Sequence, residues 1–121
     1  MPQDFQITGT QGERRAREYL AGKGYALLAQ NFRMRGAEID LIAQDEETIV
    51  FIEVKTRSGA HSVPGREAVT AAKQRRICQG ALYYLMKNGL MNRQARFDVI
   101  EIQGERVTHI VNAFLYQGPS F

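Results

Sequence analysis

The chain has 121 residues, enough for one domain with a single hydrophobic core. Apolar residues make up 44% and charged residues 24%, as in ordinary soluble proteins, and no apolar run approaches the roughly 20 residues of a membrane span. The single cysteine, Cys78, excludes an internal disulfide and a cysteine-based zinc cage. The N-terminus lacks the features of a secretory signal. We therefore expect one cytoplasmic domain over residues 1–121 and no membrane partner.

The net charge of +3 conceals an uneven distribution of charged residues. Six acidic residues and no basic ones lie between Glu38 and Glu53. Basic residues dominate on both sides, with six against one acid in Arg14–Arg35 and eight against one acid in Arg57–Arg96. Two interpretations stay open: the charge runs are solvated faces, or basic flanks hold a polyanion around a cation bound at the acidic centre.

The predicted elements follow the order α-β-β-β-α-β-β. A first helix begins after Thr10, which with Glu13 fits a capping box, and ends near residues 22–24. Strands are expected over 25–32, 37–43 and 48–56, a long helix over 66–87, and two strands over 95–102 and from 106 to 113 onward; residues 58–65 have the composition of a mobile loop. A helix between strands implies a crossover, so we expect an α/β fold with a mixed sheet flanked by helices.

Hydrophobic patterning predicts which residues face the core. One face of the second strand should carry Ala37, Ile39, Leu41 and Ala43. The inward stripe of the long helix should comprise Val69, Ala72, Ile77, Ala81, Tyr84 and Leu85. The third strand is apolar on both faces, which is typical of a central strand covered on both sides.

The second and third strands form a predicted hairpin. Symmetry about residues 46–47 places Asp40 opposite Glu53 and Glu38 opposite Lys55, with opposed Cβ atoms about 4.5–5.5 Å apart. Two facing carboxylates repel each other, and a divalent cation such as Mg²⁺ would relieve the repulsion. Lys55 could position an attacking water and offset charge in a phosphorane-like transition state.

Asp40, Glu53 and Lys55 thus form a minimal set for metal-assisted phosphodiester hydrolysis. A structural alternative stays open, in which Glu53 and Lys55 mark only the point where the strand leaves the core and Glu38 pairs with Lys55. A register slip of one or two residues would favour that alternative.

One stretch of the sequence resembles the PD-(D/E)xK motif of restriction-endonuclease-like nucleases. It consists of Asp40, twelve intervening residues and then Glu53-Val54-Lys55. From about Gly12 to Phe114 the chain looks like the YraN-type family of bacterial proteins, described as predicted endonucleases. The resemblance implies the αβββαβ core of that nuclease fold. It is carried by Gly12-Glu13, Gly24-Tyr25, Asn31-Phe32-Arg33, Glu38 to Ile42, Phe51 to Arg57, Val69 with Lys73, Tyr84-Leu85 and Arg96 to Val99.

The resemblance also implies roles for individual residues. Asp40 and Glu53 match the metal-binding carboxylates, and Mg²⁺ or Mn²⁺ is the implied cofactor. Val54 would lend its carbonyl oxygen to the metal, and Lys55 matches the catalytic lysine. Glu13 matches a first-helix glutamate that completes the acidic cluster in related Holliday-junction resolvases; a helix-capping role is the alternative, and both can hold.

Several basic side chains are candidates for binding nucleic-acid phosphates. They are Arg33, Arg35, Arg57, Lys73, Arg75 and Arg76. Arg57 is favoured because it extends the strand that carries Glu53. Lys73 stands where the nuclease fold sometimes adds a polar active-site group, although a solvated helix lysine is the favoured interpretation. Arg75 and Arg76 could equally be solvated helix residues.

Three functions stay open at this point. The first is a metal-dependent nuclease, with structured or branched DNA among its candidate substrates. The others are a catalytically silent nucleic-acid-binding module and an assembly protein that retains the fold. We expect nucleic acid as the partner, with DNA favoured over RNA, and a homodimer stays open because resolvase-like members of the fold act as dimers.

Overall fold

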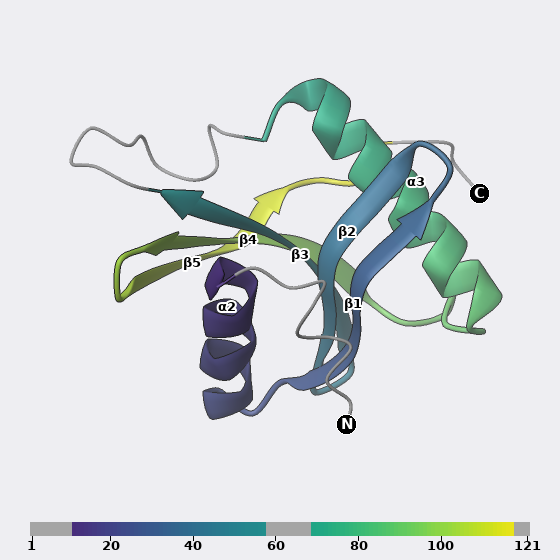
Figure 1. Ribbon diagram of the computed structural model, residues 1–121. Coiled ribbons are helices and arrows are strands. Elements are labelled where there is room, and N and C mark those ends of the chain that lie inside the picture. Colours follow the sequence, from purple (N-terminus) through teal and green to yellow (C-terminus); the bar gives the residue numbers. More distant parts are fainter. Residues whose placement is uncertain (1–10, 58–68, 118–121) are drawn as a thin grey trace.

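The computed structural model describes residues 11–57 and 69–117, which form a five-stranded sheet with α2 on one face and α3 on the other (Figure 1). Strands lie in the order β1-β2-β3-β4-β5; β3 and β4 are parallel and the other neighbours antiparallel. The elements are α2 (Gln11–Gly22), β1 (Ala26–Met34), β2 (Ala37–Asp45), β3 (Thr48–Arg57), α3 (Ala71–Lys87), β4 (Ala95–Gln103) and β5 (Arg106–Phe114). The predicted α/β fold with a mixed sheet flanked by helices is confirmed, and it is consistent with a restriction-endonuclease-like core. The predicted cap at Thr10 and loop at 58–65 lie outside the described residues.

The central strand β3 is buried on both faces, as its two-sided apolarity predicts. Val50 and Ile52 pack with Ala16 and Leu20 of α2 on one face. Phe51 belongs to the core on the opposite face, below α3. The sheet therefore holds two separate apolar layers, and β3 contributes alternate residues to each.

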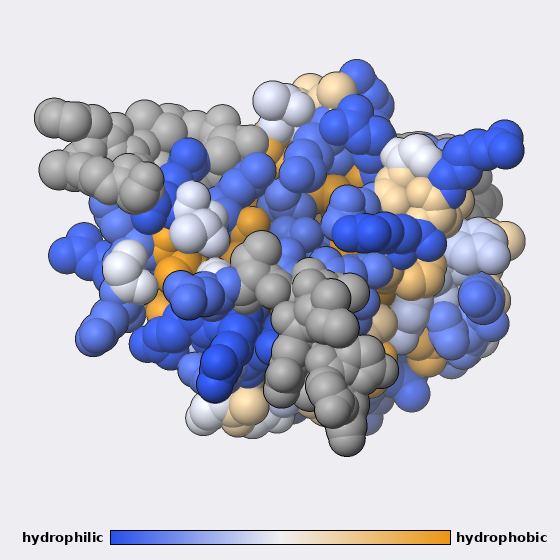
Figure 2. Space-filling model, in the orientation of Figure 1, coloured by the Kyte–Doolittle hydropathy of each residue, from blue (hydrophilic) through white to orange (hydrophobic). Residues whose placement is uncertain are grey.

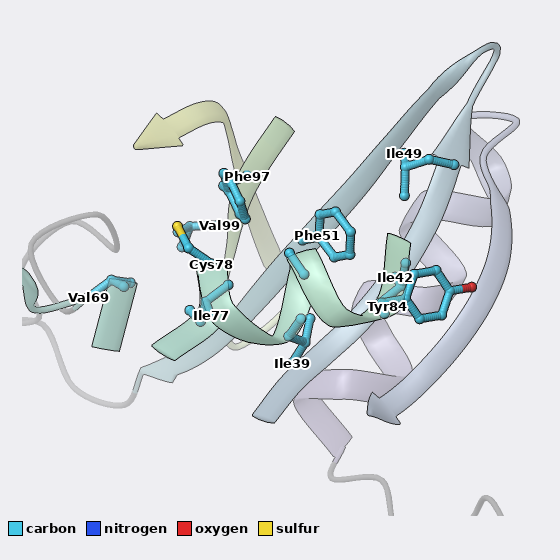
Figure 3. Packing of buried hydrophobic residues seen from close by; sticks show 11 residues of the cluster. Ile39, Ile42, Ile49, Phe51, Val69, Ile77, Cys78, Tyr84, Phe97 and Val99 are labelled. Carbon is cyan, nitrogen blue, oxygen red and sulfur yellow. The ribbon is translucent and has the colours of Figure 1, made fainter. Parts of the chain in front are cut away.

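The layer below α3 is built from aromatic and branched side chains (Figure 3). Phe51 lies edge-on to Tyr84, with ring centroids 6.1 Å apart, and stacks with Phe97 at 5.7 Å. Aromatic pairs in these geometries add to the stabilisation that comes from burial alone. This packing fixes α3 across β2, β3 and β4.

The helix α3 begins later than the sequence pattern predicts. Its first residue is Ala71, not Arg66, because Thr70 is extended (φ −67°, ψ 163°) and its hydroxyl accepts a hydrogen bond from the Lys73 amide at 3.2 Å. This is an N-cap, which satisfies an amide that has no partner within the helix.

The predicted inward stripe of the long helix is wrong at Ala72, which is exposed. Its other members are buried or partly buried, as predicted: Val69, Ile77, Ala81 and Tyr84 are buried, and Leu85 is partly buried. Cys78 and Gly80 are buried but were not predicted. A cysteine and a glycine give little hydrophobic signal, so periodicity did not mark them.

The strand β2 changes faces at Asp40, which overturns the predicted alternation. Ile39 contributes to the layer below α3, whereas Leu41 and Ala43 contribute to the layer below α2. Residues two apart in a regular strand share a face, so the strand is irregular at Asp40. Across the pair with β1, the residue opposite this point, Asn31, has a positive φ of 50°.

Gly80 lies where α3 packs tightly against β2. A Cβ atom added there would lie 3.2 Å from the Ala37 Cβ and 3.3 Å from the Ile39 Cδ1. We expect Gly80→Val to lower the free energy of unfolding by about 2 kcal/mol or more, because a branched side chain must push the helix off β2. Urea denaturation would measure the loss.

Gly22, at the end of α2, provides the matched control for this substitution. A Cβ atom there meets nothing within 4 Å, so Gly22→Val should change stability by less than about 1 kcal/mol. Equal losses in the two variants would contradict the close approach at Gly80.

Candidate functional site

The centre of the candidate site is the point where β2 parts from β3. The predicted hairpin register is correct from Asp45–Thr48 to Leu41–Ile52, and within the described strands the pairing ends there. The prediction that Asp40 lies directly opposite Glu53 is therefore wrong. Instead the Asp40 carboxylate, through Oδ2, accepts a hydrogen bond from the Val54 amide at 2.8 Å. A side-chain oxygen thus replaces the backbone acceptor that a regular ladder would offer, and the two strands diverge.

Glu53 follows directly on β3 and is almost completely buried. Its side chain is 3% exposed, and two ammonium groups contact the same oxygen, Oε2. The Nζ of Lys73 lies at 2.6 Å and the Nζ of Lys55 at 3.4 Å. Burial alone would lower the pKa of Lys73, but its hydrogen bond and charge interaction with Glu53 outweigh that effect, so the pKa is raised. Lys73 is therefore cationic at neutral pH.

These residues line one pocket of about 430 Å³ at the divergence of the strands. Its walls come from α2, β2, β3 and α3 and comprise Glu13, Glu38, Asp40, Glu53, Val54, Lys55, Thr56, Lys73 and Arg76. The structure thus brings together all four predicted catalytic residues. Lys73 lies among them, so it is not merely a solvated helix residue.

The pKa of Asp40 is the clearest electrostatic signature of the pocket. It rises from an ordinary 3.8 to about 7, first because the carboxyl is buried and second because of the negative charge of Glu53. The Val54 amide and Lys73 lower it, and Glu13 raises it further. Burial and the neighbouring carboxylate therefore destabilise the negative charge of Asp40, which a bound cation would favour.

The donor set suits a hard divalent cation, whose preferred ligands are oxygens. Among residues 11–57 and 69–117, no three histidine, cysteine, aspartate or glutamate side chains lie close enough to form a metal cage. Glu13 shares the pocket without completing such a cluster. A cation here would rest on Asp40 and Glu53 together with backbone, water or phosphate oxygens, as Mg²⁺ commonly does.

The remaining predicted residues lie at different distances from this pocket. Arg76 borders it and also a shallower neighbouring hollow, which is lined by Arg33 and the turn between β1 and β2. Arg35 and Arg75 are exposed. Hydrophilic residues predominate among the coloured residues on the face of the molecule shown in Figure 2. Arg57 differs, because its Nε donates to the Glu101 carboxylate at 2.9 Å, in a pair that is largely shielded from solvent.

The suggested pairing of Glu38 with Lys55 does not form. Glu38 lies 3.4 Å from Arg33 on β1, and both side chains are largely exposed. Lys55 instead contacts Glu53 on its own strand. The structural alternative for these charges is therefore wrong in its pairing.

A second buried polar cluster was missed by the sequence analysis. Asp98 on β4 is fully buried and contacts the Arg96 Nε at 3.1 Å and the His109 Nε2 at 2.8 Å. It also accepts the amide of Asn112 at 3.0 Å, and His109 continues to the Tyr19 hydroxyl of α2 at 3.1 Å. Burial would raise the pKa of Asp98, but these hydrogen bonds outweigh it and the pKa is lowered. The cluster joins β4, β5 and α2.

The pattern of residues matches a known family over most of the chain. The sequence model of a protein family, described as "Uncharacterised protein family UPF0102", matches residues 12–102 of this chain. The chain belongs to the UPF0102 family. This confirms the YraN-type resemblance.

UPF0102 proteins resemble this chain closely in several bacteria. The UPF0102 protein of Geobacter metallireducens is 48% identical over 110 residues, covering 88% of this chain and 90% of the relative. Those of Persephonella marina and Symbiobacterium thermophilum are 42% identical over 108 residues and 51% over 96. The alignments cover 89% and 78% of this chain, and 93% and 80% of the two relatives. The names of these UPF0102 relatives state a family and no activity.

In the part of this chain that the structure describes, neither helix is long and apolar enough to cross a membrane.

The raised pKa of Asp40 predicts a pH-dependent stability in the metal-free protein. The pKa of Asp40 in the folded protein, about 7, exceeds its ordinary value of 3.8. The contribution of this group to the free energy of unfolding is therefore complete at low pH and is lost as pH rises through about 7. Between about pH 5 and about pH 8, the wild type should lose about 2 kcal/mol of unfolding free energy relative to Asp40→Asn. Urea denaturation of both proteins at the two pH values measures this, and parallel pH profiles would contradict it.

The Asp98 cluster predicts a purely structural effect. Asp98→Asn should lower the free energy of unfolding by about 3 kcal/mol, because it leaves Arg96 and His109 without their buried anion. Asp45→Asn is the control: Asp45 also pairs with Arg96, at 3.3 Å, but its side chain is 37% exposed, so the loss should stay below about 1 kcal/mol. Similar thermal unfolding of the two variants would refute this ranking.

Proposed function

We propose that this UPF0102 protein is a divalent-metal-dependent nuclease that hydrolyses phosphodiester bonds of nucleic acid. The observation that carries the proposal is the convergence of Asp40, Glu53 and Lys55 in one pocket at the divergence of β2 and β3. The two carboxylates would bind a cation. The lysine beside them would stabilise negative charge on a phosphate. This is the donor set that metal-assisted phosphoryl chemistry requires.

The residues of the pocket fit Mg²⁺ or Mn²⁺. Asp40 and Glu53 would hold the ion through carboxylate oxygens, Val54 through its carbonyl oxygen, and Glu13 directly or through water. The pKa of Asp40 is raised first by burial and second by the negative charge of Glu53, and a bound cation would favour the charged form of both carboxylates. When bound, the ion supplies Lewis-acid polarisation of the scissile phosphate.

Lys55 would position the attacking water and stabilise charge that develops on the phosphate. Its ammonium is held 3.4 Å from Glu53, and its side chain is 24% exposed. A group held in this way needs little reorganisation during the reaction, which is the basis of electrostatic preorganisation. The Asp40 carboxylate is held by the Val54 amide, so β3 positions both the metal-binding aspartate and the lysine.

The basic residues around the pocket suggest the path of the substrate backbone. Arg76 connects the pocket to the hollow beside Arg33, and Arg35 lies in the adjoining turn. These side chains would bind phosphates on one side of the reacting bond. Arg57 is a weaker candidate than its place on β3 indicates, because Glu101 already neutralises it. DNA, including branched DNA, is the substrate class that we favour.

Cleavage assays with Mg²⁺ or Mn²⁺ test the proposal. The wild type is offered labelled single-stranded, duplex and branched DNA, and RNA of the same sequences. Asp40→Asn, Glu53→Gln and Lys55→Met should each reduce the cleavage rate by about 100-fold or more, because each removes a charge that acts in the transition state. Circular dichroism would verify that the variants fold.

Glu47→Gln is the matched control. Glu47 belongs to the same acidic stretch but is exposed in the turn between β2 and β3, outside the pocket, so its rate should equal that of the wild type. Failure of the wild type to cleave any substrate would refute the nuclease. Retained binding would then favour the silent nucleic-acid-binding module, and absence of binding at low salt would favour the assembly protein.

A further inference from the structure

Lys73 makes the shortest charged contact of the candidate site although it comes from a different element. Its Nζ lies 2.6 Å from the Glu53 Oε2, whereas Lys55, on the same strand as Glu53, lies at 3.4 Å. The backbone of Lys73 is fixed in the first turn of α3, where its amide is bound by the Thr70 hydroxyl. The helix cap thus sets where this side chain starts, and the side chain spans from α3 to β3.

Two ammonium groups on one carboxylate oxygen leave little room for a third cation. A divalent ion bound by Glu53 would lie within a few ångströms of both lysines, and like charges at that separation repel strongly in a partly buried site. Movement of one ammonium away from the Glu53 Oε2 would therefore favour binding of the ion.

Lys73 is the lysine better placed to leave. Its side chain is 35% exposed, against 24% for Lys55, and its four-carbon stem can swing into the open part of the pocket while its backbone stays in α3. Arg76, one turn further along the same helix, also borders this space. A displaced ammonium beside Arg76 would face the same solvent-filled volume, where a phosphate could bind both groups.

We infer that Lys73 occupies the position of a cation at Glu53 and couples the binding of the divalent metal to the binding of nucleic acid. This inference rests on the proposed function. Without nucleic acid, the Lys73–Glu53 contact competes with the metal and weakens its affinity. With nucleic acid present, a phosphate receives the displaced ammonium, so each ligand raises the affinity of the other, as thermodynamic linkage requires.

Titration of Mn²⁺ into the full chain, followed by electron paramagnetic resonance of the free ion, tests this coupling without any need for activity. Lys73→Met should bind Mn²⁺ about tenfold more tightly than the wild type, because the competing charge is gone. A short DNA duplex with a cleavage-resistant phosphorothioate backbone should tighten Mn²⁺ binding to the wild type, and this enhancement should largely vanish in Lys73→Met.

Two further variants separate the role of Lys73 from a general charge effect. Lys87→Met removes a lysine from the exposed end of the same helix and should leave both Mn²⁺ affinity and coupling as in the wild type. Lys73→Arg keeps the charge and should retain the weak Mn²⁺ affinity of the wild type. Matching thermal unfolding would show that all variants fold.

The outcomes distinguish this inference from the proposed function. Unchanged or weaker Mn²⁺ binding in Lys73→Met, with binding abolished by Asp40→Asn, would overturn the coupling role and leave the metal site intact. An equal gain in Lys87→Met would likewise overturn it. Absence of Mn²⁺ binding to the wild type, with and without the duplex, would overturn the proposed function itself.

Discussion

The hydrogen bond from the Val54 amide to the Asp40 carboxylate organises the rest of the site. It ends the ladder between β2 and β3 and opens the pocket at that point. It also coincides with the change of faces in β2, so that Ile39 and Leu41 supply opposite layers of the core. Asp40 therefore lies both where the two strands part and where β2 passes from the layer below α3 to the layer below α2.

The structure uses this device twice, with opposite electrostatic outcomes. Asp98 accepts the amide of Asn112 from β5 as Asp40 accepts that of Val54, and the β4–β5 register also shifts there. Arg96 and His109 contact Asp98, and its pKa is lowered. Asp40 is buried beside Glu53, and its pKa is raised. Hydrogen-bond donors thus stabilise the Asp98 carboxylate, whereas burial and the neighbouring Glu53 destabilise the Asp40 carboxylate.

Sequence patterns predicted the order of elements, the central strand and the hairpin register, because turn position and alternating apolar residues determine these features locally. They could not predict that the Asp40 carboxylate would accept the Val54 amide in place of a backbone carbonyl, since such a contact leaves no periodic pattern in the sequence. The contact of Lys73 with Glu53 depends on the start of α3 at Thr70, and Asp98 is buried by partners from distant elements. Such features follow from three-dimensional packing, and in the site they decide the charge balance.

The divergence of the strands also bears on solubility. Beyond Ile52, β3 keeps its pairing with β4 as far as Arg57 but has lost its pairing with β2, so a strand edge opens inside the sheet. Free edges invite other chains to add a strand, and charged residues along them oppose this. Glu53, Lys55 and Arg57 alternate along this stretch. Charged residues that line the pocket are therefore also of the kind that opposes intermolecular strand pairing at an open edge.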